Sequence, residues 1–185
     1  MDTTQIRGLF LDRDGVINEE VGYLNKSEEV RFVPGIFSLC RTAQTLGYKL
    51  IVVTNQSGIA RGFYTEADFH HLMDWMRGEF KREGITLDAV YFCPFHPEHG
   101  VGDYRQEHED RKPSPGMLRR GAREFGLALT ESVMVGDRCS DIAAANTAGL
   151  RQAFLLAGTE PSSCKGQYTN ATSLADVEQW LVEQD

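Results

Sequence analysis

Short apolar segments alternate with longer amphipathic segments along most of this chain. Segments rich in β-branched and other apolar residues predict strands, and they lie at Gly8–Leu11, Leu50–Thr54, Ala89–Cys93, Val133–Gly136 and Ala153–Leu156. Patterns typical of helices lie at Ile36–Leu46, from a Thr65 cap to about Glu83, and at Gly116–Phe125, Ser140–Ala148 and Leu174–Val182. Strands that alternate with helices predict an α/β fold with a mainly parallel sheet covered on both faces.

Glycine, serine and proline mark the ends of several predicted helices. Gly47, Gly84 and Gly149 directly follow helical patterns, as glycines that end helices commonly do. Ser114 and Pro115 predict a helix start, with Ser114 as the N-cap and Pro115 at the first helical position. The sequence contains no internal repeat and no linker, so residues 1–185 are expected to form a single domain.

Composition narrows the possible environments and partners. The chain has 185 residues, 41% of them hydrophobic, and a formal net charge of −8, which argues against nucleic acid as the main partner. It contains no apolar run long enough to span a membrane, and Met1–Gln5 does not resemble a signal peptide. Four scattered cysteines (Cys40, Cys93, Cys139, Cys164) without a C-x-x-C pattern favour a reduced, cytoplasmic setting over a disulfide framework. We expect a cytoplasmic monomer that does not bind membranes.

Two aspartates directly follow the first predicted strand. Asp12 and Asp14 are two residues apart, and side chains at this spacing point the same way on an extended segment. Two adjacent carboxylates repel each other unless a cation offsets their charge. One could act as a nucleophile and the other as an acid/base, and these are the two roles that phosphoryl transfer through an aspartyl-phosphate requires. The same D-x-D pattern also occurs in calcium loops, helix caps and surface turns.

Other polar groups follow later predicted strands, where ligands bind in open parallel sheets. Thr54-Asn55-Gln56-Ser57-Gly58 could form a phosphate cradle or a polar turn. Asp137, with Asp141 beyond it, could complete an oxygen-rich magnesium site or cap the next helix. Arg111 and Lys112 instead precede the predicted helix start at Ser114, and they could bind a phosphate or lie in a solvated loop.

The order of these groups resembles the haloacid dehalogenase superfamily of phosphohydrolases. The resemblance implies a Rossmann-like three-layer sandwich, Asp12 as the nucleophile and Asp14 as the acid/base. Thr54 and Lys112 would position and neutralise the phosphoryl group. Magnesium would be held by Asp12, Asp137 and the main-chain carbonyl of Asp14, with Asp141 supporting the site from outside the metal's ligands.

A narrower resemblance rests on longer motifs. Asp12–Asn18 (DRDGVIN), Gly22-Tyr23, Thr54–Gly62 (TNQSGIARG) and Arg111-Lys112-Pro113 are similar to a group of heptose-bisphosphate and histidinol-phosphate phosphatases. The resemblance implies removal of the C7 phosphate of a heptose 1,7-bisphosphate in the synthesis of nucleotide-activated heptose for surface polysaccharide, with histidinol phosphate as the alternative substrate. The implied substrate contacts are Glu20, Val21, Gly22, Tyr23, Asn55, Gln56, Ser57, Arg111 and Arg138. A non-enzymatic binding protein is disfavoured because Asp12, Asp14, Lys112 and Asp137 are all present.

Access to the site depends on the connecting segments. The span from Asp14 to Thr54 is too short for a separate cap domain, so the loop at about 94–110 is the expected wall for substrate recognition. In the family this loop often carries a structural zinc ion. Here Cys93, His96, His108 and Asp110 are candidate ligands, but Phe95 stands where a histidine is expected, so a zinc-free loop is slightly favoured.

Overall fold

The computed structural model describes residues 5–157 and 163–184, and within them the strands form one six-stranded sheet. The strand order is β3-β2-β1-β4-β5-β6, and every neighbouring pair is parallel. The strands are β1 (Arg7–Leu11), β2 (Tyr48–Asn55), β3 (Ala89–Cys93), β4 (Val133–Gly136), β5 (Gln152–Leu156) and β6 (Thr169–Ala171). The predicted α/β fold class is confirmed.

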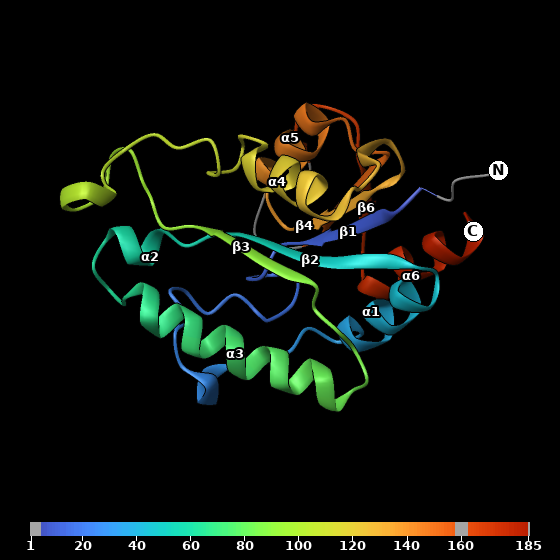
Figure 1. Cartoon of the computed structure of the whole chain (residues 1–185), viewed down its shortest axis with the longest axis horizontal. Coiled ribbons are helices and arrows are strands. Elements are labelled where there is room, and N and C mark those ends of the chain that lie inside the picture. The colour runs from blue at the N-terminus through green and yellow to red at the C-terminus, as the bar shows by residue number, and fades with distance from the viewer. Residues whose placement is uncertain (1–4, 158–162, 185) are drawn as a thin grey trace.

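Helices cover both faces of this sheet, as Figure 1 shows. One face is covered by α1 (Ile36–Thr45), α3 (Glu66–Arg82) and α6 (Leu174–Glu183), and the other by α4 (Gly116–Phe125) and α5 (Cys139–Ala148). Successive β1 residues alternate between the two cores, since Leu9 and Leu11 pack with α1 and α6 while Phe10 packs with α4 and α5. The result is the expected three-layer sandwich. None of the helices in the described ranges is long and apolar enough to cross a membrane.

Two short elements differ from the prediction. The four-residue helix α2 (Ser57–Ala60) and the three-residue strand β6 are too short to show a hydrophobic period. The predicted Ser114 cap is also wrong, because Pro115 occupies the N-cap position of α4 and the helix begins at Gly116. The remaining predicted strands and helices agree with the structure to within two residues at each end.

A disulfide joins Cys139 to Cys164, contrary to the expectation from the sequence. Cys139 is the first residue of α5, and Cys164 precedes β6, so the fold brings together two residues 25 apart in the chain. No short-range spacing marks such a pair. The other two cysteines, Cys40 and Cys93, are buried free thiols.

Candidate active site

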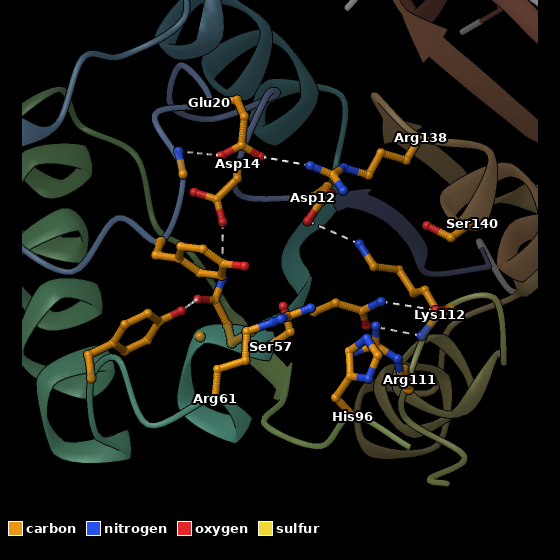
Figure 2. Close-up of a pocket in the computed structure, with 16 residues that line it drawn as sticks. Asp12, Asp14, Glu20, Ser57, Arg61, His96, Arg111, Lys112, Arg138 and Ser140 are labelled. Carbon is orange, nitrogen blue, oxygen red and sulfur yellow. Dashed lines mark hydrogen bonds and ion pairs between the residues drawn. The ribbon is translucent and has the colours of Figure 1, made fainter. Parts of the chain in front are cut away.

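The carboxyl ends of the central strands meet at a cavity of about 540 Å³. Figure 2 shows how side chains from separate segments point into it. The lining residues are Asp12, Asp14, Glu20, Gly22, Tyr23, Asn55, Gln56, Ser57, Gly58, Arg61, Tyr64, His96, Arg111, Lys112, Arg138 and Ser140. Asp12 and Asp14 therefore do converge on one space, as the spacing after β1 predicted.

Lys112 lies at the centre of the charged network. Its Nζ is 3.0 Å from Oδ1 of Asp12 and 2.6 Å from Oδ1 of Asp141, and it donates a hydrogen bond of 2.9 Å to the carbonyl oxygen of Val53. Only 3% of the Lys112 side chain is exposed, and 10% of that of Asp12. A buried ammonium group with this set of partners is a fixed positive charge beside the carboxylate.

Burial and mutual repulsion favour the protonated forms of two carboxylates. Burial raises the pKa of Asp12 to about 8, against the opposing attraction of Lys112 and with the help of the nearby carboxylates. Burial and the neighbouring Asp141 raise the pKa of Asp137 to about 7. Burial opposes the charge of Lys112, but Asp12 and Asp141 outweigh it and leave the lysine pKa above its ordinary value. The site has a surplus of negative charge that a cation would offset.

Asp12, Asp137 and Asp141 can offer oxygen atoms within 4.8 Å of one another. Oδ1 of Asp137 is buried without a hydrogen-bond partner among the described residues. Carboxylate oxygens suit a hard divalent cation, so these residues fit magnesium. Gly15 allows the close approach, because a Cβ atom there would lie 2.1 Å from Oδ2 of Asp137 and its φ of +83° also favours glycine.

Asp14 is held by hydrogen bonds rather than by the lysine. Arg13, whose side chain is 1% exposed, donates from Nε and Nη2 to Oδ1 of Asp14 at 3.1 Å and 2.9 Å. Asn18 donates to the same oxygen at 3.0 Å, and Gln56 donates to Oδ2 at 3.1 Å. Tyr64 donates in turn to Oε1 of Gln56 at 2.5 Å, which fixes the amide and identifies its Nε2 as the donor toward Asp14.

The end of β2 supports the site in two ways. Asn55 donates to the main-chain oxygen of Lys112 at 2.9 Å and accepts from its N–H at 3.0 Å, so this side chain fixes the lysine's backbone. Thr54 is 1% exposed, and its hydroxyl accepts a hydrogen bond of 2.8 Å from Gln56. Thr54 lies next to the cavity residues but is not itself among those that line it.

Most of the substrate contacts implied by the resemblance line the cavity, and Val21 does not. Arg138 is paired with Glu20 at 3.0 Å, so much of its charge is already offset. Figure 2 places this pair on one side of Asp12 and the His96–Arg111 side chains on the other. Arg111 donates to the carbonyl oxygen of Phe95 at 2.9 Å.

Gly58, in the predicted phosphate cradle, lines the cavity, whereas sequence reasoning missed three lining residues: Arg61, Tyr64 and Ser140. It considered His96 only as a zinc ligand, although this residue also lines the cavity. Arg61 lies within the TNQSGIARG motif, and Tyr64 lies two residues after its end, so this motif marks the segment that carries both residues. Nothing in the sequence pattern singled out Ser140.

The candidate zinc ligands are held by other contacts. The ring of His108 stacks on Phe95 with centroids 4.7 Å apart, and Asp110 forms an ion pair with Arg120. Cys93 is buried, and burial raises the pKa of its thiol, which disfavours the thiolate that zinc requires. Among the described residues, these side chains are not gathered into a group of possible metal ligands as Asp12, Asp137 and Asp141 are.

A buried aspartate beside a lysine, with further carboxylates at the ends of parallel strands, defines a class of enzymes that transfer phosphoryl groups through aspartate. Residues 110–178 match a family model described as HAD-hydrolase-like. The chain is similar to D-glycero-alpha-D-manno-heptose-1,7-bisphosphate 7-phosphatase of Burkholderia mallei, with 52% identity over 84% of this chain and 82% of the relative. It is also similar to the D-glycero-beta-D-manno-heptose-1,7-bisphosphate 7-phosphatase of Vibrio cholerae, with 41% identity over 94% and 95% of the two chains.

Solved structures agree with these sequence matches. A D,D-heptose 1,7-bisphosphate phosphatase from B. bronchiseptica, complexed with magnesium and phosphate, has a TM-score of 0.79 and 29% identity over 97% of this chain and 100% of the other. A HAD-like phosphatase from Mesorhizobium loti has a TM-score of 0.85 and 33% identity over 97% and 87%. The chain therefore belongs to the heptose-1,7-bisphosphate 7-phosphatase family of the haloacid dehalogenase superfamily, and it is a phosphoric monoester hydrolase.

Proposed function

We propose that the protein is a magnesium-dependent phosphatase that removes the C7 phosphate of D-glycero-D-manno-heptose 1,7-bisphosphate. The observation that carries this proposal is the buried Asp12 carboxylate, 3.0 Å from Nζ of Lys112, in a cavity that also has a basic wall. The relatives named above carry this activity in their names, and the magnesium-bound neighbour supports the choice of metal.

The reaction would take place in two displacements at phosphorus. An oxygen of Asp12 attacks, the bond from phosphorus to the C7 oxygen breaks, and the leaving oxygen takes a proton from Asp14. In the second step Asp14 removes a proton from water, the water oxygen attacks the phosphoryl group, and the carboxylate of Asp12 leaves. Lys112 stays beside the transferred group in both steps and offsets its charge, with Thr54 supporting the phosphoryl position.

Magnesium, held by Asp12, Asp137 and the main-chain carbonyl of Asp14, would offset the charge of the phosphoryl oxygens. The chain's own contribution is to bury the carboxylates and to fix their positions. Asp141 holds Lys112 from the side and accepts a hydrogen bond of 3.1 Å from the main-chain N–H of Arg138. Arg13, Asn18 and Gln56 donate hydrogen bonds to Asp14, and some of these bonds must break before Asp14 can donate a proton to the leaving group.

A second anionic group of the substrate would bind the basic wall made by Arg61, His96 and Arg111. Neither arginine forms an ion pair with a carboxylate within the described residues. Burial, Arg111, His99 and Arg61 lower the pKa of His96, which indicates that positive charges crowd this wall. A phosphate group would relieve that repulsion. A bisphosphate suits this arrangement better than histidinol phosphate, whose other end is an imidazole and an amine.

We propose that residues 1–185 form a single domain, that its 94–110 loop contributes a wall of the site, and that the protein is a monomer. The proposed substrate implies a cytoplasmic location and a role in the synthesis of ADP-heptose for lipopolysaccharide. Histidinol phosphate is the competing substrate, and the loop is proposed to be free of zinc.

Phosphate release with magnesium, measured against both anomers of the heptose bisphosphate and against histidinol phosphate, tests the substrate. Phosphorus NMR of the product should show that the C7 ester is lost and the anomeric phosphate is retained. Both anomers are needed because the names of the relatives differ on this point. A clearly higher kcat/KM for histidinol phosphate would overturn the assignment.

A further inference from the structure

Two aromatic rings from separate loops meet at the mouth of the cavity. Tyr23 follows β1, Phe63 lies between α2 and α3, and their ring centroids are 4.6 Å apart in an edge-to-face arrangement. Tyr23 lines the cavity and is 47% exposed, while Phe63 is 56% exposed. Large apolar side chains that remain exposed beside a polar site invite a functional explanation.

The backbone under Tyr23 is fixed in an unfavourable conformation. Tyr23 has a φ of +45°, in the left-handed region that residues with a side chain rarely adopt, and Gly22 before it has a φ of +68°. One carboxylate oxygen of Glu20 accepts from the N–H of Gly22 at 2.8 Å, and the other pairs with Arg138 at 3.0 Å. The turn is therefore tied to the start of α5, and strain retained in this way is typical of functional sites.

Charged and polar side chains make up most of the rest of the cavity lining. Asp12 and Lys112 are at the reacting end, and Arg61 and Arg111 are on the basic wall. The other lining tyrosine, Tyr64, is 7% exposed, and its hydroxyl is bound to Gln56. The His96 ring packs against that of His99, with centroids 4.6 Å apart. Among the described lining residues, Tyr23 thus has the most exposed aromatic ring.

We propose that Tyr23 and Phe63 form an aromatic lip that selects phosphate esters with an extended carbon skeleton. Tyr23 packs against the C–H groups of this skeleton, and Phe63 is a positioning residue that holds the Tyr23 ring over the cavity. This proposal rests on the proposed function only in taking the substrate to be a phosphate ester with such a skeleton. Small phosphate esters reach Asp12 and Lys112 without touching the lip.

Selectivity between two substrates tests the lip. For each variant, kcat/KM is measured with the heptose bisphosphate and with acetyl phosphate, which carries no sugar chain. Phe63→Ala should lower the ratio of the two values about three- to tenfold, mainly through a higher KM for the bisphosphate. Phe63→Tyr should restore the ratio. Val182→Ala, an equally exposed apolar truncation on the outer surface of α6, should leave it unchanged.

A double-substitution cycle separates positioning from direct contact. If Phe63 acts through Tyr23, the Tyr23→Ala/Phe63→Ala protein should be no less selective than Tyr23→Ala alone. Additive losses would overturn the positioning role, and an equal loss on both substrates would show a purely structural one. A dimer in sedimentation experiments that Phe63→Ala dissociates would reassign the rings to a contact between copies of the chain and overturn the proposal.

The proposed function is tested separately by the unsubstituted enzyme. If it fails to hydrolyse the heptose bisphosphate, the same ratio is measured with histidinol phosphate or whichever extended ester it does hydrolyse. The lip predicts the same loss of selectivity there, so its failure is distinguishable from a wrong substrate assignment.

Discussion

The ammonium group of Lys112 lies 3.0 Å from Oδ1 of Asp12, and both side chains are buried. The same ammonium group is 2.6 Å from Asp141, so one cation serves two carboxylates. A lysine in this position has two effects that can be measured apart. It stabilises the folded protein against the repulsion of buried acids, and it is placed to bind the phosphoryl group that reaches Asp12.

Lys112→Met should therefore lose both stability and activity. Removing one partner of a buried ion pair typically costs about 3–5 kcal/mol of unfolding free energy, because the other charge remains buried. Urea unfolding at pH 8 in a chelator measures this cost. Lys49→Met is the matched control, since Lys49 pairs with Asp88 at 2.9 Å but is 43% exposed, and such pairs contribute about 0–1 kcal/mol. Equal losses in the two variants would contradict the central role of Lys112.

Asp12→Asn should abolish magnesium-dependent phosphate release, because an amide cannot form the covalent intermediate. Asp14→Asn should cost roughly two to four orders of magnitude in kcat, the usual contribution of general acid–base catalysis. The rate of phosphate release by each purified variant is compared with that of the unsubstituted enzyme, and circular dichroism checks that both variants fold. Substantial turnover by Asp12→Asn would rule out the aspartyl-phosphate mechanism.

Magnesium should raise the melting temperature more at pH 8 than at pH 5.5. The folded-state pKa values of Asp12 and Asp137 are raised to about 8 and about 7 from 3.8. Without a cation, the stability linked to these protons is fully present below the unfolded pKa and is lost as pH rises toward 8. A bound cation compensates for the lost protons, whereas at pH 5.5 it must displace them. Thermal unfolding in magnesium and in chelator checks this, and an equal shift at both pH values would count against the assigned ligands.

Protein purified without chelator should contain no stoichiometric zinc. Structural zinc requires a closed set of four ligands, and in this loop His108 stacks on Phe95 while Asp110 pairs with Arg120. Elemental analysis measures the metal directly. One zinc per chain that survives dialysis, and that is lost in Cys93→Ser, would show that the loop is a metal site after all.

The order in which strands and polar residues follow one another along the sequence made much of this site predictable. The buried strands read as apolar runs, and Asp12 and Asp137 directly follow two of them, so they were expected to meet because parallel strands end at one edge of a sheet. Lys112 follows no strand directly and was assigned from its place before α4 and from the family resemblance. The predicted substrate contacts at Glu20, Gly22 and Tyr23 also line the cavity.

The features that sequence reasoning missed depend on short or distant contacts. Arg61 reaches the cavity through the four-residue helix α2, which is too short to show periodicity. Cys139 and Cys164 meet only because α5 begins beside the segment that precedes β6. The pairing of Arg138 with Glu20 likewise joins residues 118 apart, and no local rule assigns a partner at that distance.

The central strand β1 lies between β2 and β4, and Gly8 donates a hydrogen bond to Ser132, 124 residues further along. During synthesis, one edge of β1 therefore stays unpaired until β4 (Val133–Gly136) has been made, which takes on the order of ten seconds at about 5–20 residues per second. An open apolar strand edge is prone to aggregation, so the nascent protein is most vulnerable in this interval. A ribosome-bound chain that stops short of Val133 should be unable to bind the metal or the sugar, however well its first half has folded.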